Sequence, residues 1–292
     1  SNGNNYLGIA EINRTSVTGS FKVNNPKYRL KHVLTTSLLF DKKYLSPFTF
    51  SYSLKREFHN HFNLYFNAGK VYRFPTINDL FWNPGGNLNL VPEEGYTSDI
   101  GIIWNKKIHK VIFTFEPSLY SRWIDNWILW QPTGSFWSPM NVKKVWNRGL
   151  ETSSKVHFIN KKITYDFTLK TAYNLSTNIE VYNSNNNSQD KQLIYTPHYK
   201  LVFKSQISYK EFTFTYLHNY TGYVFTSRDN ENFLPSFNLG RLFLSCRVKF
   251  KNNSAKIFYK INNLYNTNYQ VVMNRPMPLI NHEIGINFKI NK

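Results

Sequence analysis

The histidines and carboxylates of this sequence are the first residues to test for chemistry. His59 and His61 lie two residues apart, so on a strand their side chains would share one face and could ligate a metal ion. Neither has a cysteine or an acidic residue at a metal-site spacing, which favours two histidines at the rim of a turn. Glu116, Asp125 and Asp166 are single carboxylates with no second carboxylate placed for acid–base work. The sequence therefore predicts no enzyme, no metal site and no cofactor.

Other catalytic signatures are missing from the sequence as well. There is no Gly-x-Ser-x-Gly turn of the serine hydrolases and no glycine-rich phosphate loop. Cys246 is the only cysteine, which excludes an internal disulfide framework and a cysteine-rich metal centre. A serine hydrolase without a recognisable signature stays open as an alternative.

Aromatic and amide side chains in the connections are the best candidates for binding a ligand. Aromatic faces suit a large corrin, haem, siderophore or sugar, and amides can fix its orientation. The predicted ligand-binding residues are Trp82, Asn83, Asn87, Trp127, Trp130, Gln131, Trp137 and Asn141. The alternative is that these side chains pack the loops together or lie at a membrane interface.

Strands are the elements that must position these residues. In the stretch 163–170, for example, Ile163, Tyr165, Phe167 and Leu169 alternate with polar residues, which gives one apolar and one polar face. About fourteen such strands are predicted, most of them longer than usual in soluble proteins, with no amphipathic helix. No run of eighteen apolar residues occurs, so a transmembrane helix is excluded, whereas transmembrane strands escape hydropathy analysis.

The connections alternate between tight turns and long loops. Tight turns are predicted near 24–26, 57–60, 105–108, 160–162, 209–211 and 251–254. Between them lie a modest loop at 41–46 and long loops near 74–95, 131–141, 179–192, 227–235 and 266–281. This parity is typical of outer-membrane barrels, which have short periplasmic turns and long extracellular loops. The predicted fold is an all-β, antiparallel, up-and-down transmembrane β-barrel.

The charge of the chain supports a second interpretation. The net charge is +19 with a pI near 9.8, which would suit nucleic acid or an acidic glycan. The lysines are nevertheless dispersed, often as pairs in tight turns, which favours solvated turns and no nucleic acid partner. A basic β-protein that binds nucleic acid or acidic glycan remains the alternative, beside an outer-membrane hydrolase.

Several motifs in series carry a resemblance to a known family. They are Arg73-Phe-Pro-Thr-Ile-Asn-Asp-Leu-Phe-Trp82, Pro84-Gly-Gly-Asn87, Leu90-Val-Pro-Glu-Glu-Gly95, Ile124-Asp-Asn-Trp-Ile-Leu-Trp130, Val145-Trp-Asn-Arg-Gly-Leu-Glu151, Tyr195-Thr-Pro-His198 and Asn262-Asn-Leu-Tyr-Asn266. From about Tyr28 onward the chain resembles the barrel of TonB-dependent outer-membrane receptors, in the branch of vitamin B12 and ferric-siderophore receptors. Several motifs in order are more specific than one short match.

The resemblance implies the fold, the function and the partners of the whole protein. Such receptors have a twenty-two-stranded barrel filled by an amino-terminal plug. With about fourteen strands and no plug, residues 1–292 look like the carboxy-terminal portion of such a receptor, one partial barrel domain. The chain begins Ser1-Asn2-Gly3 without a signal segment, so either a leader was cleaved or the chain is a piece of something longer. The implied partners are the TonB–ExbB–ExbD complex acting through the plug, the plug and remaining strands, outer-membrane lipids and a surface lipoprotein.

Two departures from the family pattern lie near the end of the chain, after Pro278 and after Phe288. The final strand of family members commonly ends on an aromatic residue, whereas Phe288 is followed by Lys-Ile-Asn-Lys. After Pro278 the family often has Gly-Arg, and Leu279-Ile280 stand here.

The expected function is TonB-dependent uptake of a scarce, bulky nutrient, cobalamin, haem or a ferric siderophore, in the Gram-negative outer membrane. Arg241, Arg247 and Lys249 are expected to face the lumen.

Overall fold

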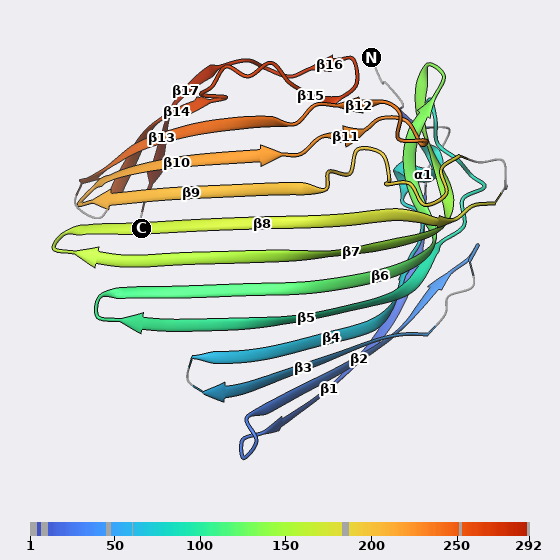
Figure 1. The fold of residues 1–292 in the computed structure, drawn as a ribbon, viewed down its shortest axis with the longest axis horizontal. Coiled ribbons are helices and arrows are strands. Elements are labelled where there is room, and N and C mark those ends of the chain that lie inside the picture. Colours follow the sequence, from blue (N-terminus) through green and yellow to red (C-terminus); the bar gives the residue numbers. More distant parts are fainter. Residues whose placement is uncertain are drawn as a thin grey trace.

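One large antiparallel sheet forms the body of the molecule (Figure 1). The computed structural model describes residues 5–6, 11–44, 48–59, 61–182, 187–250 and 253–290. Within these ranges thirteen strands are hydrogen-bonded in the order in which the chain produces them. They are β1 (Arg14–Asn25), β2 (Leu30–Asp41), β3 (Thr49–His59), β4 (Phe62–Arg73), β5 (Glu93–Ile108), β6 (Val111–Thr133), β7 (Phe136–Asn160), β8 (Ile163–Glu180), β9 (Tyr199–Tyr209), β10 (Phe212–Thr221), β13 (Phe237–Phe250), β14 (Asn253–Asn262) and β17 (Asn281–Lys289). The predicted all-β meander is confirmed.

The smaller elements lie in the connections. They are α1 (Ile77–Phe81), β11 (Val224–Phe225), β12 (Phe233–Leu234), β15 (Gln270–Val272) and β16 (Arg275–Pro276). The prediction of no helix was wrong for α1, where the Thr76 and Asp79 side chains each accept a hydrogen bond from the other residue's backbone N–H in a capping box. Five residues are too few to show a helical period, so the apolar pattern could not reveal it.

The two ends of the sheet differ as the sequence predicted. Tight turns join β1–β2, β5–β6, β7–β8 and β9–β10 at the end that lies on the left in Figure 1, where β3 is also followed by β4 and β13 by β14. The connections 74–92, 222–236 and 263–280 and the described residues of the connection 181–198 lie at the opposite end. We call the first the short-turn end and the second the elaborated end.

One predicted long loop is a hairpin instead. Residues 131–141 continue β6 and β7, which pair without a register shift up to Thr133 and Phe136. Gly134, with a φ of +67°, supplies the left-handed backbone that so tight a turn requires. Pro132 and Pro139 are both accommodated in this two-stranded extension, with Pro139 opposite Trp130. β6 and β7 are therefore 23 and 25 residues long.

The two faces of the sheet differ in polarity. On one face, apolar residues stand beside one another across strands, as in the row Ile100, Leu119 and Leu150, and all three are exposed. On the opposite face the side chains are polar and bonded across strands. Asn67 donates to Asp99 at 2.8 Å, and Tyr120 donates to Asn174 at 2.7 Å. Alternation with period two thus separates an apolar face from a polar one.

Gly149 on β7 shows how closely this polar face is packed. A Cβ at this position would lie 2.2 Å from the carbonyl oxygen of Tyr173 and 2.7 Å from the hydroxyl oxygen of Tyr120. Only a residue without a side chain leaves room for the Tyr120 ring to cross the strand.

Basic residues gather on the polar face near the short-turn end. Arg247 and Lys249 line a hollow there together with Lys210 and Lys256, and Glu211 is the acidic residue of its described lining. Arg241, Arg247 and Lys249 alternate with Leu242 to Val248 along β13, so they share this face, as the sequence predicted.

The sheet is curved and open. Its order begins at β1 and ends at β17, and the two strands do not pair with each other in the described parts of the chain. Among these parts, no helix is long and apolar enough to cross a membrane. The buried apolar cluster formed by Leu80, Leu90 and Ile128 lies at the elaborated end, where the connections pack on the strands.

Candidate ligand-binding surface

The extended β6–β7 hairpin is the scaffold of the elaborated end. Alternation along β6 places Ile128 and Trp130 on one face and Leu129 and Gln131 on the other. The first face packs against the connection 74–92, and the second lies against residues 187–194 and Arg228. The hairpin therefore joins three connections that are far apart in the sequence.

On the first face, a buried carboxylate anchors the short helix α1 to the hairpin. Asp79 is 5% exposed, and its Oδ1 accepts a 2.8 Å hydrogen bond from Nε1 of Trp130. Its Oδ2 accepts from the backbone N–H of Thr76 at 2.9 Å. Burial alone would raise the pKa of Asp79, but the hydrogen bonds from Thr76 and Trp130, with the nearby Arg73 charge, outweigh it and hold the pKa below 3.8. Asp79 is thus an anionic structural anchor.

A second anchor joins the end of β4 to the start of β5. The Arg73 guanidinium donates to both carboxylate oxygens of Glu93, at 2.7 and 2.6 Å. Glu93 Oε1 also accepts a 2.7 Å hydrogen bond from the backbone N–H of Ile128. A bidentate arginine–carboxylate pair is geometrically specific. It fixes the base of the 74–92 connection against β6.

Two predicted ligand residues hold the rest of this connection in place. Asn87 donates to the carbonyl oxygen of Pro139 at 3.0 Å. The Asn141 side chain accepts from the N–H of Val91 and donates to its carbonyl oxygen, both at 3.0 Å, which mimics a strand pair. With Trp130, these amides therefore position the connection on the hairpin.

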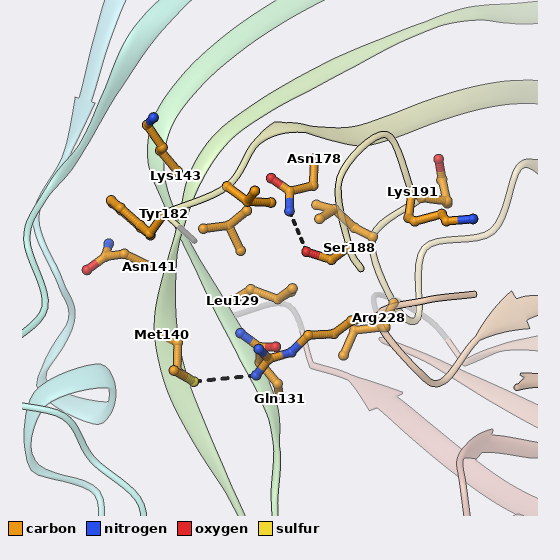
Figure 2. Close-up of a pocket in the computed structure, with 15 residues that line it drawn as sticks. Leu129, Gln131, Met140, Asn141, Lys143, Asn178, Tyr182, Ser188, Lys191 and Arg228 are labelled. Carbon is orange, nitrogen blue, oxygen red and sulfur yellow. Dashed lines mark hydrogen bonds between the residues drawn. The ribbon is translucent and has the colours of Figure 1, made fainter. Parts of the chain in front are cut away.

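The second face of the hairpin borders a half-open cavity of about 140 Å³, shown in Figure 2. Leu129, Gln131 and Met140 come from the hairpin, and Arg228 comes from the connection between β11 and β12. Asn178 and Ser188, which share a hydrogen bond of 2.8 Å, form another wall. The remaining described lining residues are Asn141, Val142, Lys143, Val181, Tyr182, Lys191, Gln192, Leu193 and Ile194. We call this space the hairpin cavity.

The other predicted residues occupy separate places. Trp127 borders a wider hollow of about 610 Å³ that also contains Arg73, Glu93 and Arg122. Trp82 packs edge-on against Tyr6 with ring centroids 5.9 Å apart.

Asn83 and Trp137 complete the predicted set. Asn83 is exposed, and its backbone N–H donates to Asn5 at 2.9 Å. Trp137 lies against Tyr195, with ring centroids 5.3 Å apart. The structure brings Gln131 and Asn141 together at the hairpin cavity but leaves Trp82, Trp127 and Trp137 outside its lining.

Several residues of the hairpin cavity were not predicted from the sequence. Leu193 and Ile194 form an apolar pair beside the polar stretch 187–192, a signal that was visible. Arg228 and Lys191 gave no signal, because their place depends on how two connections fold back onto β6 and β7. The segment 187–194 runs beside the last part of β8, where the backbone N–H of Leu193 donates to the carbonyl oxygen of Ser176 at 2.8 Å.

The three carboxylates considered for acid–base chemistry each lie next to a basic side chain. Asp166 lies 2.6 Å from His157, Glu116 pairs with Lys155 at 3.5 Å and Asp125 pairs with Lys144 at 3.6 Å. In the described part of the chain no three potential metal ligands come together. The side chain of His59 lies outside the described residues.

Comparison with known proteins identifies the family. The model described as TonB dependent receptor-like, beta-barrel matches residues 11–264. The vitamin B12 transporter BtuB of Vibrio vulnificus (strain YJ016) is 33% identical over 87 residues, which cover 29% of this chain and 14% of that protein.

Solved structures agree on the fold. The ferric enterobactin receptor PfeA of Pseudomonas aeruginosa, as a G324V mutant, is 14% identical with a TM-score of 0.68, covering 94% of this chain and 44% of that chain. The siderophore receptor PirA of Acinetobacter baumannii is 12% identical with a TM-score of 0.68, covering 94% and 45%. The chain spans less than half of these receptors, and its likeness to them shows the fold. The open thirteen-stranded sheet and the family match together establish that the chain belongs to the family of TonB-dependent receptor β-barrels.

Proposed function

We propose that the protein acts in the outer membrane of a Gram-negative bacterium as a receptor that takes up a scarce, bulky nutrient by TonB-dependent active transport. The nutrient class is cobalamin, haem or a ferric siderophore. The matched relative named a vitamin B12 transporter and the solved structures named siderophore receptors support this choice. The family match favours it over a basic protein that binds nucleic acid or glycan, and over a hydrolase.

The observation that carries the proposal is the exposed apolar face of the sheet. At its carboxy-terminal edge Ile284, Ile286 and Phe288 are 77%, 54% and 72% exposed and stand on one face of β17. Soluble monomers rarely expose contiguous apolar patches of this kind. Hydrocarbon chains of a bilayer would cover the face, and the bonded polar groups of the opposite face would point to a lumen.

An open sheet in a membrane requires further parts of the receptor. Residues 1–292 form part of a single barrel domain, which additional strands complete because lipid does not tolerate open sheet edges. A plug domain fills the lumen and receives energy from the TonB–ExbB–ExbD complex. A surface lipoprotein is a further proposed partner. The basic hollow at Lys210, Arg247, Lys249 and Lys256 offers the plug a surface of positive charge.

In this mechanism the elaborated end captures the nutrient. The proposed contacts are Trp82, Asn83, Asn87, Trp127, Trp130, Gln131, Trp137 and Asn141. Among them Asn87, Trp130 and Asn141 use their polar groups to hold the connection 74–92 on the hairpin. They would present a rigid surface, which lowers the entropic cost of binding. Displacement of the plug then lets the ligand pass without chemical change.

Membrane fractionation tests the proposal. The protein should remain with outer membranes after a high-salt wash, require detergent for extraction and migrate faster on a gel when unboiled. Release into the soluble fraction by salt alone would contradict it, because a lipid-facing sheet cannot be detached by ionic strength.

A further inference from the structure

The hairpin cavity combines an apolar wall with a positively charged rim. Leu129, Val142, Val181, Leu193 and Ile194 supply aliphatic surface. The charged residues of its described lining are Lys143, Lys191 and Arg228, and none of its described lining residues is acidic. An occupant with an apolar body and a negative end fits this distribution better than a neutral or cationic one.

The charge of Arg228 is not neutralised by a neighbouring carboxylate. Its Nη2 donates to the Sδ of Met140 at 3.6 Å, and thioether sulfur is a weak acceptor. No carboxylate lies within ion-pair distance of this guanidinium in the part of the chain that the structure describes. Lys143, by contrast, pairs with Glu180 at 3.3 Å. Arg228 therefore retains its capacity for a bidentate bond to an anion.

A buried acceptor lies on the same wall. Gln131 is 4% exposed, and its Oε1 has no hydrogen-bond partner. Leaving a buried carbonyl oxygen unpaired costs free energy, so the site is incomplete without a donor. Gln131 is on the face that carries Leu129, which is directly opposite Met140, the residue that Arg228 contacts. The acceptor and the cation thus line the same cavity, and Met140, which Arg228 contacts, lies opposite the neighbouring position on the same face of β6.

We propose that the hairpin cavity is a subsite for an apolar arm that ends in a carboxylate next to an N–H donor, the chemistry of an N-acylated aliphatic amino acid. The carboxylate binds Arg228, the N–H donates to Gln131 Oε1, and the aliphatic part lies against Leu193 and Ile194. The inference deepens the proposed function, since such an arm belongs to the imported ligand.

The cavity volume limits how much of the ligand it can hold. A half-open cavity of about 140 Å³ accommodates an arm of roughly a dozen heavy atoms and excludes a whole corrin, haem or siderophore. The bulk of the ligand therefore stays outside the cavity, and the subsite selects among ligands by the chemistry of one peripheral group.

The test measures binding of a small probe to the full-length protein in detergent. N-acetyl-L-leucine carries the carboxylate, the N–H and the aliphatic chain, whereas N-acetyl-L-leucinamide lacks the charge. Saturation-transfer NMR should show the acid bound about tenfold more tightly than the amide, as expected for a charged hydrogen bond. Equal affinity for the two probes would overturn the subsite.

Matched variants assign the effect to the cavity. Arg228→Gln should weaken N-acetyl-L-leucine binding about tenfold, and Gln131→Leu should weaken it about fivefold. Arg228→Lys should bind more tightly than Arg228→Gln, because it keeps the charge. Arg148→Gln removes the same charge from a guanidinium that stacks on Trp146 at 3.7 Å, outside the cavity, and should leave binding unchanged. A loss in Arg148→Gln equal to that in Arg228→Gln would show a general charge effect and overturn the proposal. Faster migration of each unboiled variant confirms that it folds.

The subsite and the proposed function can fail separately. Specific probe binding by a protein that supports no nutrient uptake would retain the subsite and reject the receptor function. Uptake whose KM is unchanged in Arg228→Gln, with no probe binding, would retain the receptor function and reject the subsite.

Discussion

Nε1 of Trp130 donates a 2.8 Å hydrogen bond to Oδ1 of Asp79, and this bond joins the β6–β7 hairpin to the connection 74–92 across 51 residues of sequence. The indole projects from β6, and the carboxylate belongs to α1. Because Asp79 also caps its own helix, the bond fixes the orientation of the whole 74–92 connection.

Replacing Trp130 by Phe should loosen the 74–92 connection. The ring stays large and apolar, but the donor to a buried carboxylate is lost, which costs about 1.5–3 kcal/mol of local stability. Hydrogen exchange of residues 77–90 should become about tenfold faster or more. Trp123→Phe is the matched control, because Trp123 stacks on Trp146 with ring centroids 4.4 Å apart, away from α1. Equal acceleration in both variants would contradict the assigned role.

Acid should release the same connection. The pKa of Asp79 is lowered in the folded protein, so its contribution to stability is complete above the unfolded value near 3.8 and is lost as the pH falls through the lower folded pKa. Tryptophan fluorescence followed from pH 6 to pH 2 should show a transition in this acid range. In Asp79→Asn that component should be missing, and its persistence in the variant would assign it to another group.

His198 should give a second pH response at higher pH. Burial lowers its pKa below 6.5, and its ring packs against Tyr223 and Phe225 with centroids 5.8 and 6.3 Å apart. The folded state therefore favours neutral His198. Its packing should weaken as the pH falls from about 6.5 through the folded pKa. Proteolysis within 222–226 should increase from pH 7 to pH 5, and His198→Phe should remove this increase. The same increase in His198→Phe would contradict the role of protonation.

Substitution of Gly149 should impair folding of the sheet. An added Cβ would lie 2.2 Å from the Tyr173 carbonyl oxygen, so Gly149→Ala forces the backbone or the Tyr120 ring to move, at about 1–3 kcal/mol. The folded, faster-migrating form in unboiled membranes should decrease. Gly19→Ala on β1 is the control, because its Cβ would meet Thr36 Oγ1 at an ordinary 3.6 Å. An undiminished folded fraction in Gly149→Ala would refute the packing argument.

The sequence predicted the repeating part of the structure and missed what depends on three-dimensional neighbours. Period-two alternation was sufficient to predict strands such as 163–170. The alternation of tight turns with long loops along the chain predicted which connections lie at each end of the sheet. The hairpin at 131–141 was missed because Pro132 and Pro139 suggest a loop in isolation. They are tolerated there because β5 pairs with β6 only up to Asp125 and β8 with β7 only from Lys144, so each strand of the extension has one side without a strand partner in the described parts.

The candidate site was predicted in part for a related reason. Residue type pointed to Gln131, which lies at the hairpin cavity with an unpaired oxygen. Residue type could not separate it from Asn87 and Asn141, whose amides are bonded to Pro139 and Val91. Arg228 joins the cavity through a contact with Met140, 88 residues away, that no local pattern encodes.

Energised uptake by whole cells is the most direct test of the receptor function. Cells that express the protein should accumulate radiolabelled cobalamin, labelled haem or a ferric siderophore, and accumulation should disappear when either this gene or TonB is deleted. If accumulation of all three ligand classes is the same with and without the gene, the protein is not the nutrient receptor that we propose.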